Sequence, residues 1–224
     1  MRFVSALAAG IALLCPAASA DVRSRLDLMP LPRSALGPGA GALALSRISG
    51  VLSNADAARS AGHGFTAADL AGRGRITGYT LDYRRPIITV PQTRHELLGV
   101  QTIAELYSNR TTATRGLAFW SGVTRKRKTL PNGVTVAASP FRAPVGDGSF
   151  AFELTYRDSG RPLYYVGDVV FRSGGLLGAV FVSATDTRGL RARTVHLAHD
   201  LARRMKRVLA GRIHASPVKL PTRH

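Results

Sequence analysis

Three polar side chains near the C-terminus have the types and spacing of a metal site. His196, His199 and Asp200 stand three and four positions apart, so a helix would place them on one face. Imidazole and carboxylate groups are zinc ligands, and such a set would serve a metal-dependent hydrolase. A further ligand would have to come from His95, Glu96 or His214.

A solvated helix face is the alternative for the same residues. Asp200 can pair there with His196, Arg203 or Arg204, and the neighbouring guanidinium groups would repel a bound cation. The sequence also has no P-loop, no G-x-G-x-x-G, no H-E-x-x-H and no G-x-S-x-G motif. We therefore expect a protein that is not an enzyme, with no catalytic residues, no metal and no cofactor.

A set of arginines and aromatic residues forms a candidate ligand pocket. Arginine beside aromatic rings can hold an anionic or aromatic ligand. The alternative is that the aromatic side chains belong to the core or the rim of a sheet. The set consists of Arg73, Arg75, Tyr79, Tyr83 and Trp120.

The first twenty residues have the pattern of a secretory signal peptide. Arg2 precedes an apolar run from Phe3 to Cys15, and Ala18-Ser19-Ala20 matches an A-x-A cleavage site. The run is shorter than the roughly 20 residues that span a bilayer, so we expect no transmembrane segment after cleavage. The chain is predicted to be exported, to a periplasm or to the cell exterior.

Basic residues far outnumber acidic ones. Lys and Arg total 31 against 13 for Asp and Glu, a formal net charge of +18. Such a chain is attracted to anionic surfaces. For an exported protein we expect an anionic envelope surface or polymer, or an envelope protein, as the partner. Peripheral contact with a membrane belongs to this expectation, whereas nucleic acid does not. The alternative is solvated charge with no dedicated partner.

The candidate anion-binding residues fall in two groups. One is a run of four consecutive bases at 125–128, which can contact phosphate or lipid head groups. These bases also follow a predicted helix end, where cations offset the helix dipole. The other group lies on the last predicted helix. The full set is Arg125, Lys126, Arg127, Lys128, Arg193, Arg203, Arg204, Lys206 and Arg207.

Composition divides the chain into four parts. Residues 1–20 are the signal peptide, and residues 21–47 are rich in Pro, Gly and Ala, which predicts a linker. Leu26, Leu28 and Leu31 could nevertheless dock this linker on the domain. Residues 48–213 form a single domain, and residues 214–224 form a basic tail.

The order of elements within the domain predicts an α+β fold. Ser53 or Asn54 can cap a helix over 54–61, and Thr66 begins a second one. A third helix is expected over 111–122. Period-two patterns and glycine turns predict about six antiparallel strands, at 75–85, 99–108, 134–138, 149–157, 163–172 and 176–184.

The last helix, expected over 187–210, is amphipathic. Leu197, Leu201 and Met205 share one face, which should pack on the sheet, while the opposite face carries the bases named above. This long C-terminal helix completes the predicted fold.

Several short segments resemble those of a group of exported bacterial proteins of unknown function. They are 53–58 (SNADAA), 74–79 (GRITGY), 106–107 (LY), 146–147 (GD) and 171–172 (FR). Over residues 50–210 the layout is similar to the PsbP-like fold of photosystem accessory proteins and LpqN-type lipoproteins. The resemblance implies an α/β/α sandwich, with helices on both faces of the sheet, and a binding or accessory role. Leu14, before Cys15, departs from the lipoprotein cleavage pattern.

Three hypotheses of function follow from these observations. The first is an exported, non-enzymatic binding or accessory domain of the cell envelope, with a basic surface for an anionic partner. The second is a metal-dependent hydrolase built on the helical His and Asp residues. The third is a structural module that docks through apolar surface, whose association salt would not weaken.

Overall fold

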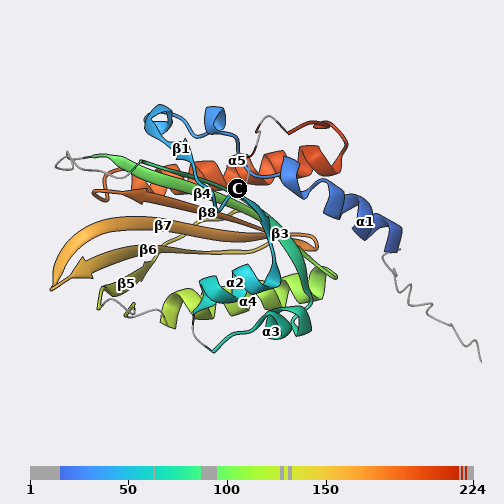
Figure 1. The fold of residues 1–224 in the computed structure, drawn as a ribbon, viewed down its shortest axis with the longest axis horizontal. Helices are drawn as coiled ribbons and strands as arrows, with labels where there is room; N and C mark the ends of the chain where they lie inside the picture. The colour runs from blue at the N-terminus through green and yellow to red at the C-terminus, as the bar shows by residue number, and fades with distance from the viewer. Residues whose placement is uncertain are drawn as a thin grey trace, which may run out of the picture.

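An open antiparallel sheet lies between two layers of helices (Figure 1). The computed structural model describes residues 16–62, 64–86, 95–126, 129–130, 133–216, 218 and 220. Its elements are α1 (Pro16–Ser24), the 3₁₀ turns η1 (Leu26–Leu28), η2 (Arg33–Ala35) and η3 (Ala40–Ala42), β1 (Ala44–Leu45), β2 (Gly50–Leu52), α2 (Asn54–Ala61), α3 (Ala67–Gly72), β3 (Arg75–Arg84), β4 (Leu97–Tyr107), α4 (Arg110–Lys126), β5 (Thr135–Pro140), β6 (Ser149–Asp158), β7 (Arg161–Ser173), β8 (Leu176–Ala184) and α5 (Leu190–Leu209).

The sheet has the strand order β1-β3-β4-β8-β7-β6-β5, and β2 also pairs with β3. The six predicted strands are all present, which confirms the α+β class and the antiparallel pairing. The expected number of strands was too low, because the described residues contain eight. The two additional strands, β1 and β2, have two and three residues, and segments this short carry no readable alternation.

Capping boxes begin two of the helices. Ser53 accepts a hydrogen bond from the Asp56 backbone N–H, and the Asp56 carboxylate accepts one from Ser53 in return. Thr66 and Asp69 do the same at α3. These reciprocal bonds satisfy backbone donors that a helix start leaves open. The sequence therefore locates both helix starts correctly.

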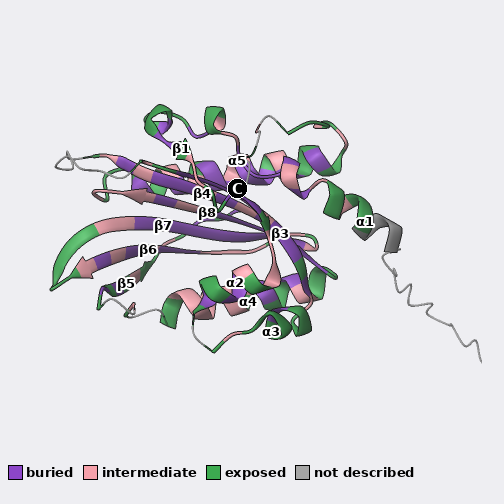
Figure 2. Cartoon of the chain, in the orientation of Figure 1, coloured by how far each residue is buried: buried purple, intermediate pink, exposed green. Residues whose placement is uncertain are grey.

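Helices cover both faces of the sheet. In Figure 1, α5 lies along one face, and α2, α3 and α4 lie across the other. Leu197, Leu201 and Met205 on the inner side of α5 are fully buried against β7 and β8. Figure 2 shows this buried stripe and the buried strands beneath it. The predicted apolar face of the last helix is therefore confirmed.

The segment predicted as a linker is part of the core. Leu26, Leu28, Met29, Leu31 and three other apolar residues between 21 and 43 are buried in the main hydrophobic cluster, together with residues of α5. We call residues 21–43 the N-terminal strap. The strap leucines dock on the domain, as the sequence allowed. This packing fixes a segment whose Pro and Gly content suggested a flexible linker.

The two ends of the chain are described only in part. The apolar run Phe3–Cys15 lies outside the described residues, and α1 contains the predicted cleavage site. In the predicted basic tail, Val218 packs against the main core, as does Ile213 just before that tail. Across the described ranges, no helix is long and apolar enough to cross a membrane.

Candidate ligand cleft

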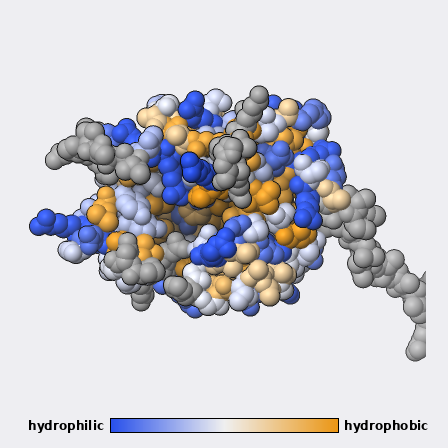
Figure 3. Space-filling model, viewed as in Figure 1, coloured by the Kyte–Doolittle hydropathy of each residue, from blue (hydrophilic) through white to orange (hydrophobic). Residues whose placement is uncertain are grey.

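A cleft of about 770 Å³ opens between the sheet and the helices α2 and α4. Figure 3 shows it as a hollow near the centre of the face, with hydrophobic residues gathered around it and hydrophilic groups on the rim. A volume of this size is typical of sites for small molecules.

The floor of the cleft consists of neighbouring rows of side chains that cross β3, β4, β8, β7 and β6. Residues directly opposite one another on antiparallel strands point to the same face. One row contains Arg84, Gly99, Ser183, Val166 and Leu154. The next row contains Asp82, Gln101, Phe181, Asp168 and Phe152. Of these ten residues, Phe152 alone does not line the cleft.

Two helices form the wall above this floor. Trp120, Val123 and Thr124 of α4 and Ala57 and Ser60 of α2 line the cleft. The hydroxyl of Thr124 donates to the carboxylate of Asp168 across 3.3 Å, which ties the wall to the floor. Because α2 and α4 are both fixed to the sheet, the cleft is preformed.

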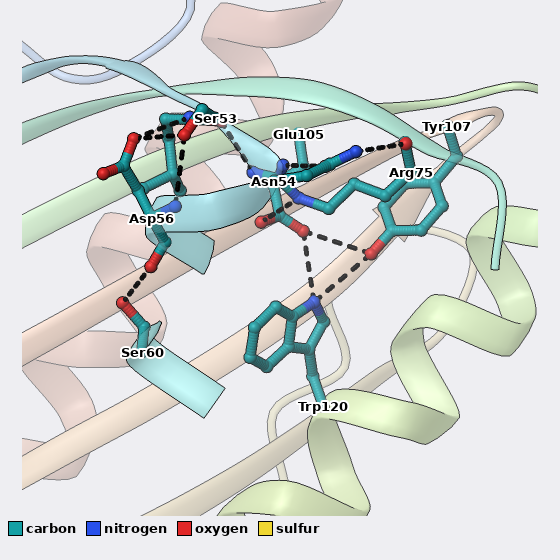
Figure 4. A network of polar contacts seen from close by, with 9 residues as sticks. Ser53, Asn54, Asp56, Ser60, Arg75, Glu105, Tyr107 and Trp120 are labelled. Carbon is teal, nitrogen blue, oxygen red and sulfur yellow. Dashed lines mark hydrogen bonds and ion pairs between the residues drawn. The ribbon is translucent and has the colours of Figure 1, made fainter. Parts of the chain in front are cut away.

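A buried polar network fixes the wall at one end (Figure 4). Nε of Arg75 donates to Oε1 of Glu105 across 2.9 Å, and Nη1 donates to Oδ1 of Asn54 across 2.6 Å. The indole N–H of Trp120 lies 3.2 Å from both Oε2 of Glu105 and the hydroxyl of Tyr107. This network joins α2, α4, β3 and β4 through one carboxylate.

A break in strand register places Arg75 in this network. The pairing of β3 with β4 shifts between Arg75 and Thr77, so Arg75 faces the same side as Gly78 and Glu105. A Cβ at Gly78 would lie 2.8 Å from Nη2 of Arg75. Glycine at position 78 therefore leaves the space that the guanidinium group occupies.

Burial raises the pKa of two acidic groups, one in the cleft and one beside it. Desolvation raises the pKa of the Tyr107 hydroxyl far above its ordinary value, and the Glu105 charge raises it further. Desolvation also raises the pKa of Asp82, and the nearby Arg84 guanidinium partly offsets this. Both shifts follow from charge being costly in a dry environment.

The structure does not bring the predicted pocket residues together. Trp120 alone lines the cleft, and Arg75 lies behind it, bonded to Glu105. Tyr79 and Tyr83 face the opposite side of β3, where Tyr83 is buried in the main core and Tyr79 packs against it. Arg73 stacks over Phe119 at 4.6 Å. The register break in β3 separates residues that simple alternation would have aligned.

Two of the predicted anion-binding arginines hold the N-terminal strap. Nη2 of Arg193 donates to the carbonyl oxygens of Leu36 and Pro38, across 2.9 and 2.6 Å. Nε of Arg204 donates to the carbonyl of Leu28 across 2.7 Å. Burial lowers the pKa of both arginines. These two guanidinium groups therefore face the protein rather than a partner.

The remaining predicted bases that the structure describes lie on opposite sides of the sheet. On α5, Arg203 pairs with Asp200, while Lys206 and Arg207 are exposed. At the end of α4, Arg125 lies 6.0 Å from the Phe152 ring, and Lys126 is exposed. Arg127 and Lys128 lie outside the described residues. The described members of the two groups therefore do not form one continuous basic surface.

One of the two helical histidines, His196, forms an ion pair with Asp200. Nε2 of His196 lies 3.4 Å from Oδ2 of Asp200 on α5. Among the described residues, no three His, Cys, Asp or Glu side chains are placed to share a metal ion. The described geometry matches the alternative of a solvated helix face.

The polar residues of the cleft floor were not among the sequence candidates. Asp82, Gln101 and Asp168 each sit within a strand, among apolar neighbours. An aspartate inside an apolar strand such as 166–171 is unusual, because charged side chains are rarely buried. That pattern is the available signal, although it does not reveal which strands are adjacent.

The fold is that of an α+β domain, and it resembles a known structure. One similar solved structure is the extracellular domain of PknH from Mycobacterium tuberculosis, with a TM-score of 0.54 and 12% sequence identity. The alignment covers 80% of this chain and 95% of that one. No family model and no curated protein matches the chain. The PsbP-like resemblance is not confirmed, and the comparison supports a fold shared with that extracellular domain.

Proposed function

We propose that this protein is an exported, non-enzymatic domain whose cleft binds a small, mostly apolar molecule. The observation that carries the proposal is the cleft itself. It has about 770 Å³ of space over a floor with Ile103, Val166 and Phe181, interrupted by a few polar groups. Such a combination is typical of ligand sites, where apolar surface supplies affinity and polar groups fix orientation.

Two further observations support this proposal. The similar structure is described as an extracellular domain, which agrees with the signal peptide expected at residues 1–20. The cleft wall is held by partly buried hydrogen bonds between α4 and the sheet. A preformed site binds with little ordering cost.

Binding is testable with the only tryptophan of the chain. Trp120 lines the cleft, so its fluorescence should respond to a ligand placed there. The purified protein is titrated with N-phenyl-1-naphthylamine, an uncharged apolar fluorophore. We expect saturable quenching of Trp120, and a linear response without saturation would contradict the proposal.

A pair of alanine substitutions locates the binding. Ala179 lines the cleft floor, whereas Ala192 is exposed on α5, on the other side of the sheet. Ala179→Phe should abolish the saturable response, and Ala192→Phe should leave it unchanged. Circular dichroism of both variants confirms that they are folded. If folded Ala179→Phe protein still saturates, the probe binds elsewhere.

The second part of the proposal is a basic surface, which contains fewer residues than the sequence predicted. Lys206 and Arg207 are exposed on α5 beside Arg203, and they are free of the strap contacts that hold Arg193 and Arg204. We propose that these three residues attract the domain to an anionic envelope component. Co-sedimentation with anionic vesicles should fall with added salt and with the triple change to glutamate, and binding that resists both would contradict it.

A further inference from the structure

The two ends of the cleft floor differ in chemistry. At the β3 and β4 end the side chains are those of Arg84, Asp82 and Gln101. At the β6 end they are those of Leu154 and Tyr156, which belong to a hydrophobic cluster. The rows cross five strands, and four spacings of about 4.8 Å make the floor about 19 Å long. A ligand that fills it lengthwise must be polar at one end and apolar at the other.

The accessible charge at the polar end is positive. Arg84 pairs with Asp82, yet 61% of the Arg84 side chain is exposed against 4% of Asp82. Arg85 pairs with Glu96, and the arginine is again the more exposed side chain, at 31% against 16% for the glutamate. In both pairs the carboxylate is therefore the more covered partner, and the arginine that lines the cleft is the more exposed one.

One N–H group of the Arg85 side chain makes no hydrogen bond within the described residues. Its Nε is buried, and within the described ranges it has no hydrogen-bond acceptor. A buried donor without an acceptor is costly, and Arg85 lines the cleft. An anionic oxygen at this end of the cleft would pair with the exposed part of the Arg85 guanidinium group and with Arg84. Guanidinium groups suit carboxylate and phosphate oxygens in particular.

We propose that the cleft takes an elongated amphipathic anion. Its carboxylate or phosphate head lies at Arg84 and Arg85, and its apolar body lies along Phe181 and Val166 toward Leu154. This inference rests on the proposed function of the cleft and adds the chemical class of the ligand. Asp168 also lines the cleft, opposite Phe181 in the same row, and its carboxylate accepts a hydrogen bond from Thr124 of α4.

The test compares probes that share one chain and differ in the head group. The protein is titrated with decanoate, decyl phosphate, decan-1-ol and decylammonium, each below its micelle threshold, with Trp120 fluorescence as the signal. Decanoate or decyl phosphate should bind roughly tenfold or more tightly than decan-1-ol, as a charge-assisted hydrogen bond predicts. Which of the two anions binds more tightly distinguishes a carboxylate from a phosphate head.

Arginine variants show where the head group lies. Arg85→Gln should remove most of the preference for the anion while leaving decan-1-ol binding unchanged. Arg115→Gln, on the exposed side of α4, is the matched control and should change neither. Arg84→Lys keeps the charge near Asp82 and should weaken anion binding less than Arg85→Gln does.

The outcomes separate the two proposals. If no decyl probe of any charge produces a saturable response, the proposed function of the cleft fails. If decan-1-ol or decylammonium binds as tightly as the anions, the cleft still binds ligands but the anionic head group is wrong. The same holds if folded Arg85→Gln protein keeps the full preference for the anion.

Discussion

Arg75 and Glu105 form an ion pair inside the protein, with Nε and Oε1 2.9 Å apart and both side chains buried. The remaining oxygen of Glu105 accepts bonds from Tyr107 and Trp120. The Glu105 carboxylate thus interacts with Tyr107 on its own strand, with Trp120 of α4 and with Arg75 of β3. Burying a pair of this kind costs desolvation free energy. Removing one partner costs more, because the other is left as a buried charge without a counter-ion.

Removing one member of the pair should therefore destabilise the fold strongly. Arg75→Met leaves the Glu105 carboxylate buried without its counter-ion. We expect a loss of about 3–5 kcal/mol in the free energy of unfolding, measured by urea denaturation. The double variant Arg75→Met/Glu105→Gln removes the stranded charge and should recover part of the loss. A loss below about 1 kcal/mol for Arg75→Met would contradict the buried charge pair.

The strap arginines should affect stability, not surface association. Arg193→Ala or Arg204→Ala removes a charged donor to strap carbonyls, which should cost about 1.5–3 kcal/mol. Arg207→Ala, exposed on the same helix, should stay within about 0.5 kcal/mol. Urea denaturation gives these values, and hydrogen exchange of residues 26–43 should quicken in the first two variants alone. Equal effects from all three would mean that the strap does not depend on them.

Two glycines of α4 should respond oppositely to alanine. A Cβ at Gly116 would lie 2.5 Å from the Tyr107 ring, while a Cβ at Gly122 meets nothing within 4 Å. Gly122→Ala should stabilise the helix by about 0.5–1 kcal/mol. Gly116→Ala should instead destabilise the protein by about 1–3 kcal/mol, as overpacking does, and should shift the emission of Trp120. Thermal unfolding with fluorescence detection compares the two variants, and stabilisation by both would contradict this packing.

Asp82 should make the protein less stable as the pH rises through its titration. Burial raises its folded-state pKa above the ordinary 3.8, so the folded state binds this proton more readily than the unfolded state, and ionisation costs stability. Asp82→Asn should therefore raise the melting temperature at pH 7, and the gain should vanish below pH 3.8. A lower melting temperature at pH 7 would mean that the Arg84 pair outweighs desolvation.

Asp147 provides the matched control with the opposite sign. The Gly174 backbone N–H and the Arg172 charge lower the pKa of Asp147. Its ionised form therefore favours the folded state, and that contribution is lost as the pH falls through the folded-state pKa. Asp147→Asn should lower the melting temperature at pH 7, and the deficit should shrink in acid.

Local sequence patterns predicted the helices and strands well, but they did not predict the ligand cleft. The helix at 54–61 and the six longer strands follow from caps, alternation and glycine turns, all of which act between near neighbours. The strap was misjudged because its Pro and Gly content outweighed leucines whose partners lie on a helix near residue 200. The cleft depends on which strands are adjacent, and the register break after Arg75 changes which side chains share a face. Neither property can be read from spacing within one strand.

The strap has a consequence for the order in which this chain can fold. Arg25, near its start, reaches the carbonyl of Val208 at the end of the last helix, a contact between residues 183 positions apart. Contacts this distant in sequence close late. A chain that emerges N-terminus first can pack its first leucines against β3 and β4, but their packing is incomplete until the last helix is also present. The main core can therefore close only after the chain has been made at least as far as residue 209, and until then the strap lacks part of its packing.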